Sequence, residues 1–189
     1  MNSKQLILIV AGEPNSIFLE ILFKSFKKIK IKKPIILIAS TKLIKLQMKK
    51  LNFKKKINLV NYQNLFHKKL SNNCLNVINV DYDTNLAFSK ISIKSKKYIN
   101  NCFEIAFKII EKNKIKNFIN GPISKKAFLN KNYLGITEFI SKKFKVKKNA
   151  MLIFNKDLSV CPITTHLPLK SVVKKINKKI ILEKIELIN

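Results

Sequence analysis

Arginine and tryptophan are absent from this sequence of 189 residues, and glycine and proline are rare. All 39 basic residues are lysines, set against 10 acidic residues, so the formal net charge is +29. Arginine is the residue that reads bases and holds phosphates bidentately, so its absence argues against specific nucleic-acid recognition. A non-specific attraction to polyanions is still expected. The abundance of lysine, isoleucine and asparagine is typical of A/T-rich codon usage, which raises the lysine count without selection for a binding surface.

Cysteine is scarce as well, and long apolar runs are missing. Cys74, Cys102 and Cys161 lie far apart and form no C-x-x-C motif, so neither a zinc knuckle nor a redox pair is indicated. We expect free, buried thiols in a reducing cytosol. No apolar run approaches the roughly 20 residues that cross a bilayer, and the apolar start at residues 6–11 is too short for a signal peptide. These features predict a cytoplasmic protein without a membrane partner.

Short apolar runs alternate with amphipathic segments along the first two thirds of the chain, and the 47% hydrophobic content predicts a folded core. Strands are expected at residues 6–11, 34–39, 57–60, 75–80 and 117–120. Helices are expected from a cap at Asn15 or Ser16, from a cap at Ser40 or Thr41 to about Lys50, and over 95–114. This rhythm predicts an α/β fold, a layered and mostly parallel sheet with flanking helices.

The few glycines and prolines concentrate in residues 120–169, which hold two of the three glycines and three of the five prolines. A helix starting near Ser124 would direct its N–H groups, and Lys125, at an anion; the alternative is a plain strand-to-helix turn.

Two further strands are expected at 150–154 and 158–163, with His166 following the second of them. An imidazole at a strand's end can bind a metal or transfer a proton, although a lone histidine can also be purely structural. Helical segments are expected from 167–169 onward and over 178–188.

Three motifs carry a resemblance to a known family: Gly121-Pro122-Ile123-Ser124-Lys125, Gly135-Ile136-Thr137-Glu138-Phe139 and Thr164-Thr165-His166-Leu167-Pro168-Leu169. In this order they resemble the 4-hydroxythreonine-4-phosphate dehydrogenase family of vitamin B6 biosynthesis. Gly12-Glu13-Pro14 lies where the family has its opening glycine-rich turn. The likeness covers essentially the whole chain but only the front part of the family's length.

The resemblance implies a two-lobed α/β enzyme with a fold like that of isocitrate and isopropylmalate dehydrogenases. Residues 1–120 would form a first α/β lobe, and 121–189 the beginning of a second, truncated lobe on the substrate and metal side. Family members oxidise the secondary alcohol of 4-hydroxythreonine 4-phosphate with NAD, and the resulting β-keto acid loses carbon dioxide. A divalent metal ion (zinc, magnesium or cobalt) holds the reacting oxygen, and a homodimer completes the site.

Individual site residues follow from the same resemblance. His166 matches the family's first metal ligand and Thr137 a substrate-binding position. Lys125 matches a basic position facing substrate phosphate or carboxylate, and it is the candidate catalytic residue. Ile136 stands where the family has a substrate-binding histidine, and its side chain can form no hydrogen bond.

Other departures bear on activity. Ser16 and Phe18 replace glycines of the family's opening turn, and the family segment with the remaining metal-binding histidines has no counterpart before Asn189. His67 lies on a segment without a family match and is not assigned to the site.

A catalytic metal site needs about three protein ligands. We therefore expect a shortened, divergent dehydrogenase that needs a second copy or a complementing fragment for activity. The alternatives are a catalytically silent remnant and a basic nucleic-acid-associated protein on the same fold.

Overall fold

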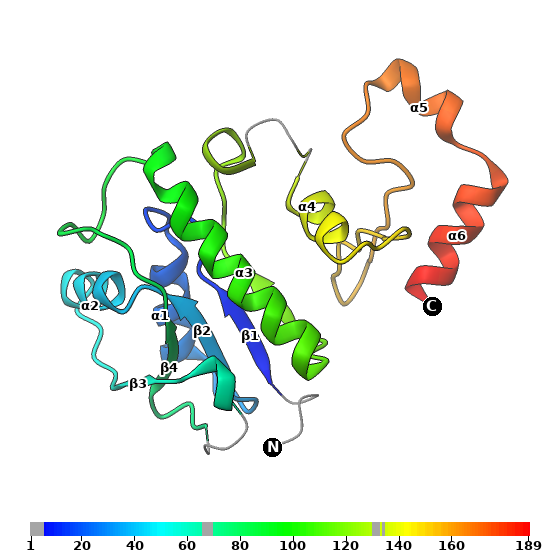
Figure 1. The fold of residues 1–189 in the computed structure, drawn as a ribbon. Helices are drawn as coiled ribbons and strands as arrows, with labels where there is room; N and C mark the ends of the chain where they lie inside the picture. Colours follow the sequence, from blue (N-terminus) through cyan, green and yellow to red (C-terminus); the bar gives the residue numbers. More distant parts are fainter. Residues whose placement is uncertain (1–5, 66–69, 130–132, 134) are drawn as a thin grey trace. The chain divides into compact units, whose positions relative to one another are not determined.

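The computed structural model describes residues 6–65, 70–129, 133 and 135–189. The chain forms two compact units, Met1–Asn130 and Lys131–Asn189, called unit 1 and unit 2 below. Unit 1 holds the β-sheet, and unit 2 consists of helices joined by irregular segments (Figure 1). The lobes suggested by the family resemblance, 1–120 and 121–189, stay a prediction.

Unit 1 is built on a five-stranded sheet whose strand order is β3-β4-β2-β1-β5. All four strand pairings are parallel. Each strand lies within one residue of its predicted ends: β1 (Ile7–Val10), β2 (Ile35–Ala39), β3 (Ile57–Leu59), β4 (Leu75–Asn79) and β5 (Phe118–Asn120). The predicted α/β fold with a parallel sheet and flanking helices is confirmed.

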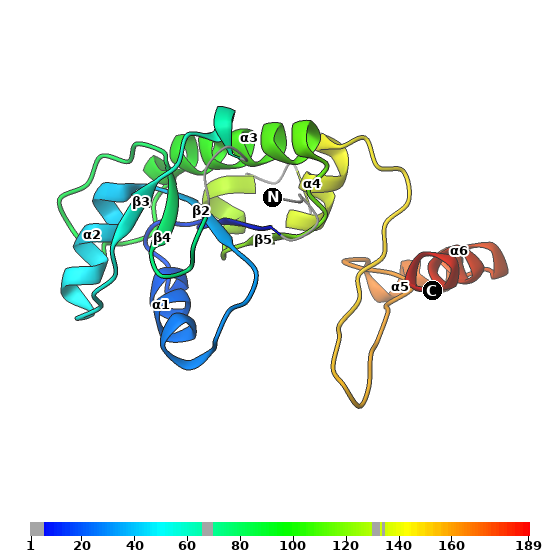
Figure 2. The ribbon, with the colours of Figure 1, turned by 90° about the horizontal axis from the view of Figure 1, so that it is seen from below.

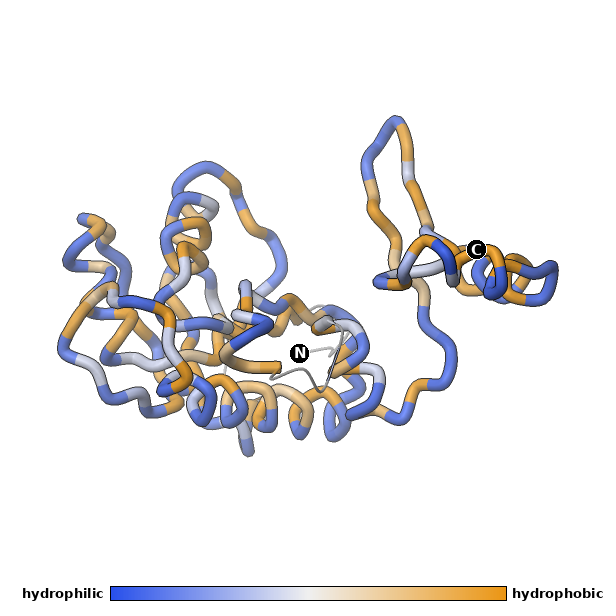
Figure 3. Tube along the Cα trace, turned by 90° about the horizontal axis from the view of Figure 1, so that it is seen from above, coloured by the Kyte–Doolittle hydropathy of each residue, from blue (hydrophilic) through white to orange (hydrophobic). Residues whose placement is uncertain are grey.

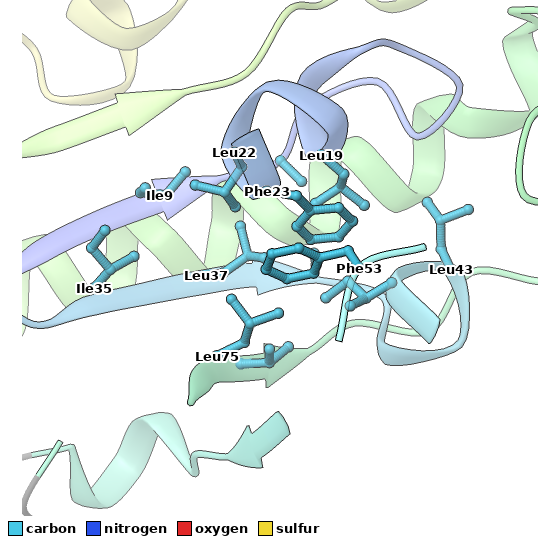
Figure 4. Close-up of a cluster of buried hydrophobic side chains, with 13 residues drawn as sticks. Ile9, Leu19, Leu22, Phe23, Ile35, Leu37, Leu43, Phe53 and Leu75 are labelled. Carbon is cyan, nitrogen blue, oxygen red and sulfur yellow. The ribbon is translucent and has the colours of Figure 1, made fainter. Parts of the chain in front are cut away.

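Helices cover both faces of the sheet, which explains why its strands β1 and β2 are continuously apolar. Figure 2 shows α3 (Lys96–Asn113) on one side and α1 (Phe18–Lys28) on the other. The core beneath α1 and α2 (Thr41–Lys50) includes Phe23 and Phe53, whose rings stack with centroids 4.4 Å apart (Figure 4). On the other face, α3 buries its apolar positions every three or four residues, as predicted.

The predicted helix caps are confirmed for one helix and wrong for another. Ser40 caps α2, since its Oγ accepts a hydrogen bond from the Leu43 N–H at 3.3 Å. The N-cap position of α1 is Ile17, one residue after the predicted Ser16, although the Ser16 hydroxyl accepts a 3.3 Å hydrogen bond from the Phe18 N–H at the start of the helix. Ser16 falls one residue short of that position because the Glu13 carbonyl accepts hydrogen bonds from both its N–H and its hydroxyl.

Three shorter helical turns also occur in the part of unit 1 that the structure describes. Two are 3₁₀ helices, η2 (Tyr62–Asn64) and η3 (Ile93–Ser95). The third, η4 (Lys125–Leu129), is a single π-helical turn that follows β5. Within the described residues, the helix predicted from Ser124 is therefore present as the five residues of η4.

Unit 2 contains α4 (Ile136–Lys143), α5 (Leu169–Lys175) and α6 (Lys178–Ile188), and Gly135 is the one buried residue among those described. The helix predicted over 178–188 is confirmed. The strands predicted at 150–154 and 158–163 are wrong, because a single antiparallel bridge joins Ile153 to Val160.

The apolar side chains around that bridge remain exposed, by 75% for Phe154 and 70% for Leu158. Figure 3 shows hydrophobic residues along both arms of this loop. A strand pair gains its stability from packing one face against another layer, and this face is uncovered among the described residues.

Candidate functional site

Two turns that contain glycine lie next to each other, one at Gly12 after β1 and one at Gly121 after β5. β1 and β5 are neighbours in the sheet, and the strand order reverses between them. Ligands of open parallel sheets bind at such a point. The Gly121 N–H donates to the Val10 carbonyl at 2.7 Å, and the Glu13 N–H donates to the Pro122 carbonyl at 2.8 Å. A Cβ on Gly12 would lie 2.4 Å from the Pro122 oxygen, and one on Gly121 would lie 2.2 Å from the Ala11 oxygen. Only glycines allow the two turns to pack this closely.

Glu13 ties this pair of turns to the start of α3. Its side chain is buried, and Oε2 accepts a 2.8 Å hydrogen bond from the Ser95 hydroxyl. Oε1 accepts a 3.3 Å hydrogen bond from the Asn15 N–H. The carboxylate therefore fixes the loop after β1, a role that the sequence reasoning missed. The available signal was an acidic residue between glycine and proline in a chain with few acids.

Lys125, the candidate catalytic residue, begins η4 and is exposed. The turn is held by Ser124, whose hydroxyl accepts from the Ala127 N–H at 3.2 Å and whose carbonyl accepts from the Phe128 N–H at 2.8 Å. Because η4 has only five residues, its N-terminus alone makes no anion site. The candidate functional group here is the Lys125 ammonium, which belongs to unit 1.

The other predicted site residues lie in unit 2. Ile136 and Thr137 form the first turn of α4, and both are partly exposed. His166 is exposed and takes a left-handed backbone conformation with φ of 57°. Its predicted place at the end of a strand is wrong, because residues 158–163 form only one isolated bridge and no strand precedes His166 in the described part of unit 2.

Gly135, the N-cap of α4, brings His166 next to the first turn of that helix. A Cβ on Gly135 would lie 3.6 Å from His166 Nε2 and 2.9 Å from Glu138 Oε2. That carboxylate oxygen is buried and has no hydrogen-bond partner among the described residues. Side-chain atoms of Glu138 and His166 therefore lie beside the position that a Cβ on Gly135 would take. The role of Glu138 was not predicted, although it stands inside a motif that carries the resemblance.

The donors present suit part of a divalent metal site. Imidazole nitrogen and carboxylate oxygen are both ligands of zinc and related cations. No cluster of three or more histidine, cysteine, aspartate or glutamate side chains that could hold a metal occurs in the described part of the chain. Glu138 and His166 are therefore two donors, fewer than a catalytic metal site needs.

The cysteines are free, as predicted, but only Cys102 is buried; Cys74 and Cys161 are partly exposed. Burial raises the pKa of the Cys102 thiol to about 12. Burial also raises the pKa of the adjacent Tyr98 phenol well above its ordinary range, and its oxygen accepts a 3.0 Å hydrogen bond from the Ser40 N–H. Both groups stay protonated and serve the core. None of the helices in the described residues is long and apolar enough to cross a membrane.

Curated relatives share a single name. The chain is 31% identical to the 4-hydroxythreonine-4-phosphate dehydrogenase of Sulfurihydrogenibium sp., over 97% of this chain and 56% of the relative. It is 26% identical to the enzyme of that name from Bacteroides thetaiotaomicron, over 94% of this chain and 49% of the relative. The chain thus spans about half the length of these relatives.

Solved structures show the same fold. The 4-hydroxythreonine-4-phosphate dehydrogenase of Burkholderia phymatum superposes with a TM-score of 0.80 at 19% identity, covering 97% of this chain and 56% of that one. A putative 4-hydroxythreonine-4-phosphate dehydrogenase of Salmonella typhimurium gives 0.81 at 18% identity, covering 97% and 57%. Residues 30–189 match the family model described as pyridoxal phosphate biosynthetic protein PdxA, and the chain belongs to this family.

Proposed function

We propose that the chain supplies part of the active site of a 4-hydroxythreonine-4-phosphate dehydrogenase, acting in cytoplasmic pyridoxal phosphate biosynthesis. The reaction is the NAD-dependent oxidation and decarboxylation of 4-hydroxythreonine 4-phosphate. The observation that carries the proposal is that His166 Nε2 lies beside Gly135, the N-cap of the helix whose first turn holds Ile136 and Thr137. These are the positions that match substrate and metal residues of the family.

Each matched side chain has a defined task in this reaction. The Thr137 hydroxyl donates or accepts a hydrogen bond with the polar substrate. The Lys125 ammonium balances the charge of substrate phosphate or carboxylate. Ile136 offers no polar atom where relatives have a histidine, which weakens substrate binding by about 1–3 kcal/mol.

The His166 imidazole holds a divalent metal ion through Nε2, the nitrogen that faces the space above Gly135. When bound, zinc, magnesium or cobalt supplies a Lewis acid for the charge that develops on the substrate oxygen. Catalytic sites use about three protein ligands. In a homodimer, a second copy of this chain carries the same side chains, so the further donors come from a complementing polypeptide.

The test is formation of NADH from substrate, NAD and metal. We expect no turnover by the purified 189-residue chain alone. Turnover should appear when a fragment with the remaining length of the Sulfurihydrogenibium relative is added, and His166→Ala should abolish it. Turnover by the isolated chain that is lost in His166→Ala would show a complete site in this chain. Inactivity in every mixture would favour the catalytically silent remnant.

A further inference from the structure

We propose that residues 84–97 bind the surface of an anionic lipid membrane. This segment comprises part of the loop after β4, the η3 turn and the first two residues of α3, and Figure 1 shows it in green, leading into α3. Its apolar side chains enter the outer part of the bilayer, and its lysines bind the lipid headgroups. The expectation of no membrane partner rested on the absence of a spanning run, and a peripheral contact needs no such run. The proposal is independent of the proposed function.

Four apolar side chains of the segment face the solvent within residues 86–93. Their exposed fractions are 62% for Leu86, 37% for Phe88, 53% for Ile91 and 65% for Ile93. Exposed apolar side chains that stand singly are normal, whereas a group of them marks contact with a protein or a membrane. The segment therefore presents an interaction surface.

Polar side chains of other elements hold the segment in place. Gln47, which is fully buried, donates from Nε2 to the Ala87 carbonyl at 2.8 Å. The Ser89 N–H donates to Asn15 Oδ1 at 3.1 Å, and Glu13 holds the start of α3 as described above. Polar groups of the segment thus make these inward contacts, while its four apolar side chains are exposed. A surface that is already held in shape loses little conformational entropy when it binds.

The charged residues of the segment are all lysines: Lys90, Lys94, Lys96 and Lys97. Three of them are exposed, and Lys96 is partly exposed. No acidic residue occurs in residues 84–103. Each lysine close to an anionic leaflet adds to the attraction, so the four strengthen one another's effect. Within the segment, the apolar side chains therefore stand among positive charges only.

The lysines also favour a membrane over a protein as the partner. Protein–protein interfaces are depleted in lysine. At a membrane, the stem of a lysine covers apolar area while its ammonium reaches the headgroups. Apolar side chains and lysines side by side are the two features that bind peripheral proteins to anionic lipid. The segment thus fits a membrane surface better than a protein surface.

The experiment is cosedimentation of the full chain with vesicles of phosphatidylcholine and phosphatidylserine at a fixed salt concentration. The net charge of +29 attracts the whole chain to these vesicles, so variants measure the contribution of the segment. Leu86→Ser with Ile93→Ser should lower the partition coefficient by about 10-fold or more, because apolar area is removed. Lys94→Gln with Lys97→Gln should lower it by about 10-fold, because attraction to the headgroups is lost.

Matched controls change the same kinds of residue elsewhere in the chain. Ile29→Ser with Val173→Ser alters side chains that are 61% and 82% exposed, and it should leave the partition coefficient unchanged. Lys30→Gln with Lys33→Gln removes two exposed lysines at the same spacing. Its effect should be clearly smaller, because these lysines precede β2 and the segment follows β4, at the other end of the parallel sheet.

Fluorescence gives a second readout, since the sequence contains no tryptophan. In Phe88→Trp, the emission should shift to shorter wavelength when the vesicles are added, because the indole leaves water. Ile29→Trp should keep its emission wavelength. An unshifted emission in Phe88→Trp, or equal partition coefficients for the segment variants and their controls, would overturn the inference and leave the proposed function standing. A shift that a complementing polypeptide causes and vesicles do not would overturn it in favour of a protein partner.

Discussion

Gly121 has no room for a side chain, because the nearest atoms belong to backbone and not to a flexible side chain. The space that a Cβ would take is filled by the oxygen and carbon of the Ala11 carbonyl, at 2.2 and 2.8 Å. We expect Gly121→Ala to lower the free energy of unfolding by about 1–3 kcal/mol, as overpacked substitutions do. Urea denaturation measures this change.

Gly135→Ala is the matched control for that measurement. Its closest contact is the end of the Glu138 side chain, which can move, and its backbone is extended. The free energy of unfolding should change by less than about 1 kcal/mol. If both substitutions change the free energy of unfolding equally, the close contact between Gly121 and the Ala11 carbonyl has no special effect on stability.

The buried pair of Tyr98 and Cys102 predicts a loss of stability in alkali. Burial keeps both groups protonated in the folded state, where the pKa of the Cys102 thiol is about 12 against an ordinary value of 9.0. Above pH 9 the unfolded chain loses protons that the folded chain retains. The free energy of unfolding therefore falls as pH rises, by about 1.4 kcal/mol per pH unit for the thiol alone. The decrease continues until the native thiol itself ionises.

Comparing variants isolates that contribution from the titration of the many lysines. Cys102→Ala should flatten the dependence of the unfolding free energy on pH above 9, whatever its effect at neutral pH. Cys74→Ala, at a partly exposed thiol, should leave the slope as in the original chain. Parallel slopes for all three proteins would contradict the protonated, buried thiol.

The matched motif residues could be found from the sequence, but their neighbours could not. Thr137 and His166 stand in recognisable strings of residues, whereas the sequence does not show that His166 lies beside Gly135, at the start of α4. Glu13 is similar, because its partner Ser95 lies at the start of α3. A single sequence does not show such distant contacts.

At the scale of elements, prediction succeeded where burial on both faces leaves a plain signal. β1 and β2 are apolar at every position, and the short apolar runs of the other three strands also end at turns, so the limits of all five were predicted to within one residue. α3 was predicted for a related reason, since its apolar positions recur with helical spacing. Local pattern and tertiary environment agree in these segments.

Prediction failed where local pattern and tertiary environment differ. Residues 150–154 and 158–163 are apolar enough for strands, yet only Ile153 and Val160 pair. Pairing over a longer stretch requires a layer to cover the apolar face, and the pattern cannot show whether one exists. The N-cap of α1 was misplaced by one or two residues because the Glu13 carbonyl holds Ser16 in the preceding turn.

At the scale of the whole molecule, unit 2 exposes apolar side chains without a core of its own among the described residues. Phe154 and Leu158 are exposed by 75% and 70%, and α6 exposes Ile181, Leu182 and Ile185 by 37%, 48% and 45%. Apolar surface of this kind marks a site of association. The net charge of +29 opposes contact between copies, and salt screens that repulsion.

We therefore expect the purified chain to self-associate increasingly as ionic strength rises, which sedimentation velocity at several salt concentrations measures. A double substitution, Phe154→Ser with Leu158→Ser, should shift the distribution toward monomer because it removes apolar area from unit 2. Ile17→Ser is the matched control in unit 1, where the isoleucine is 62% exposed, and it should leave the distribution unchanged. If the chain is monomeric at every salt concentration, the apolar surface of unit 2 does not drive association. A homodimer of the chain would then give way to a complementing polypeptide as its partner.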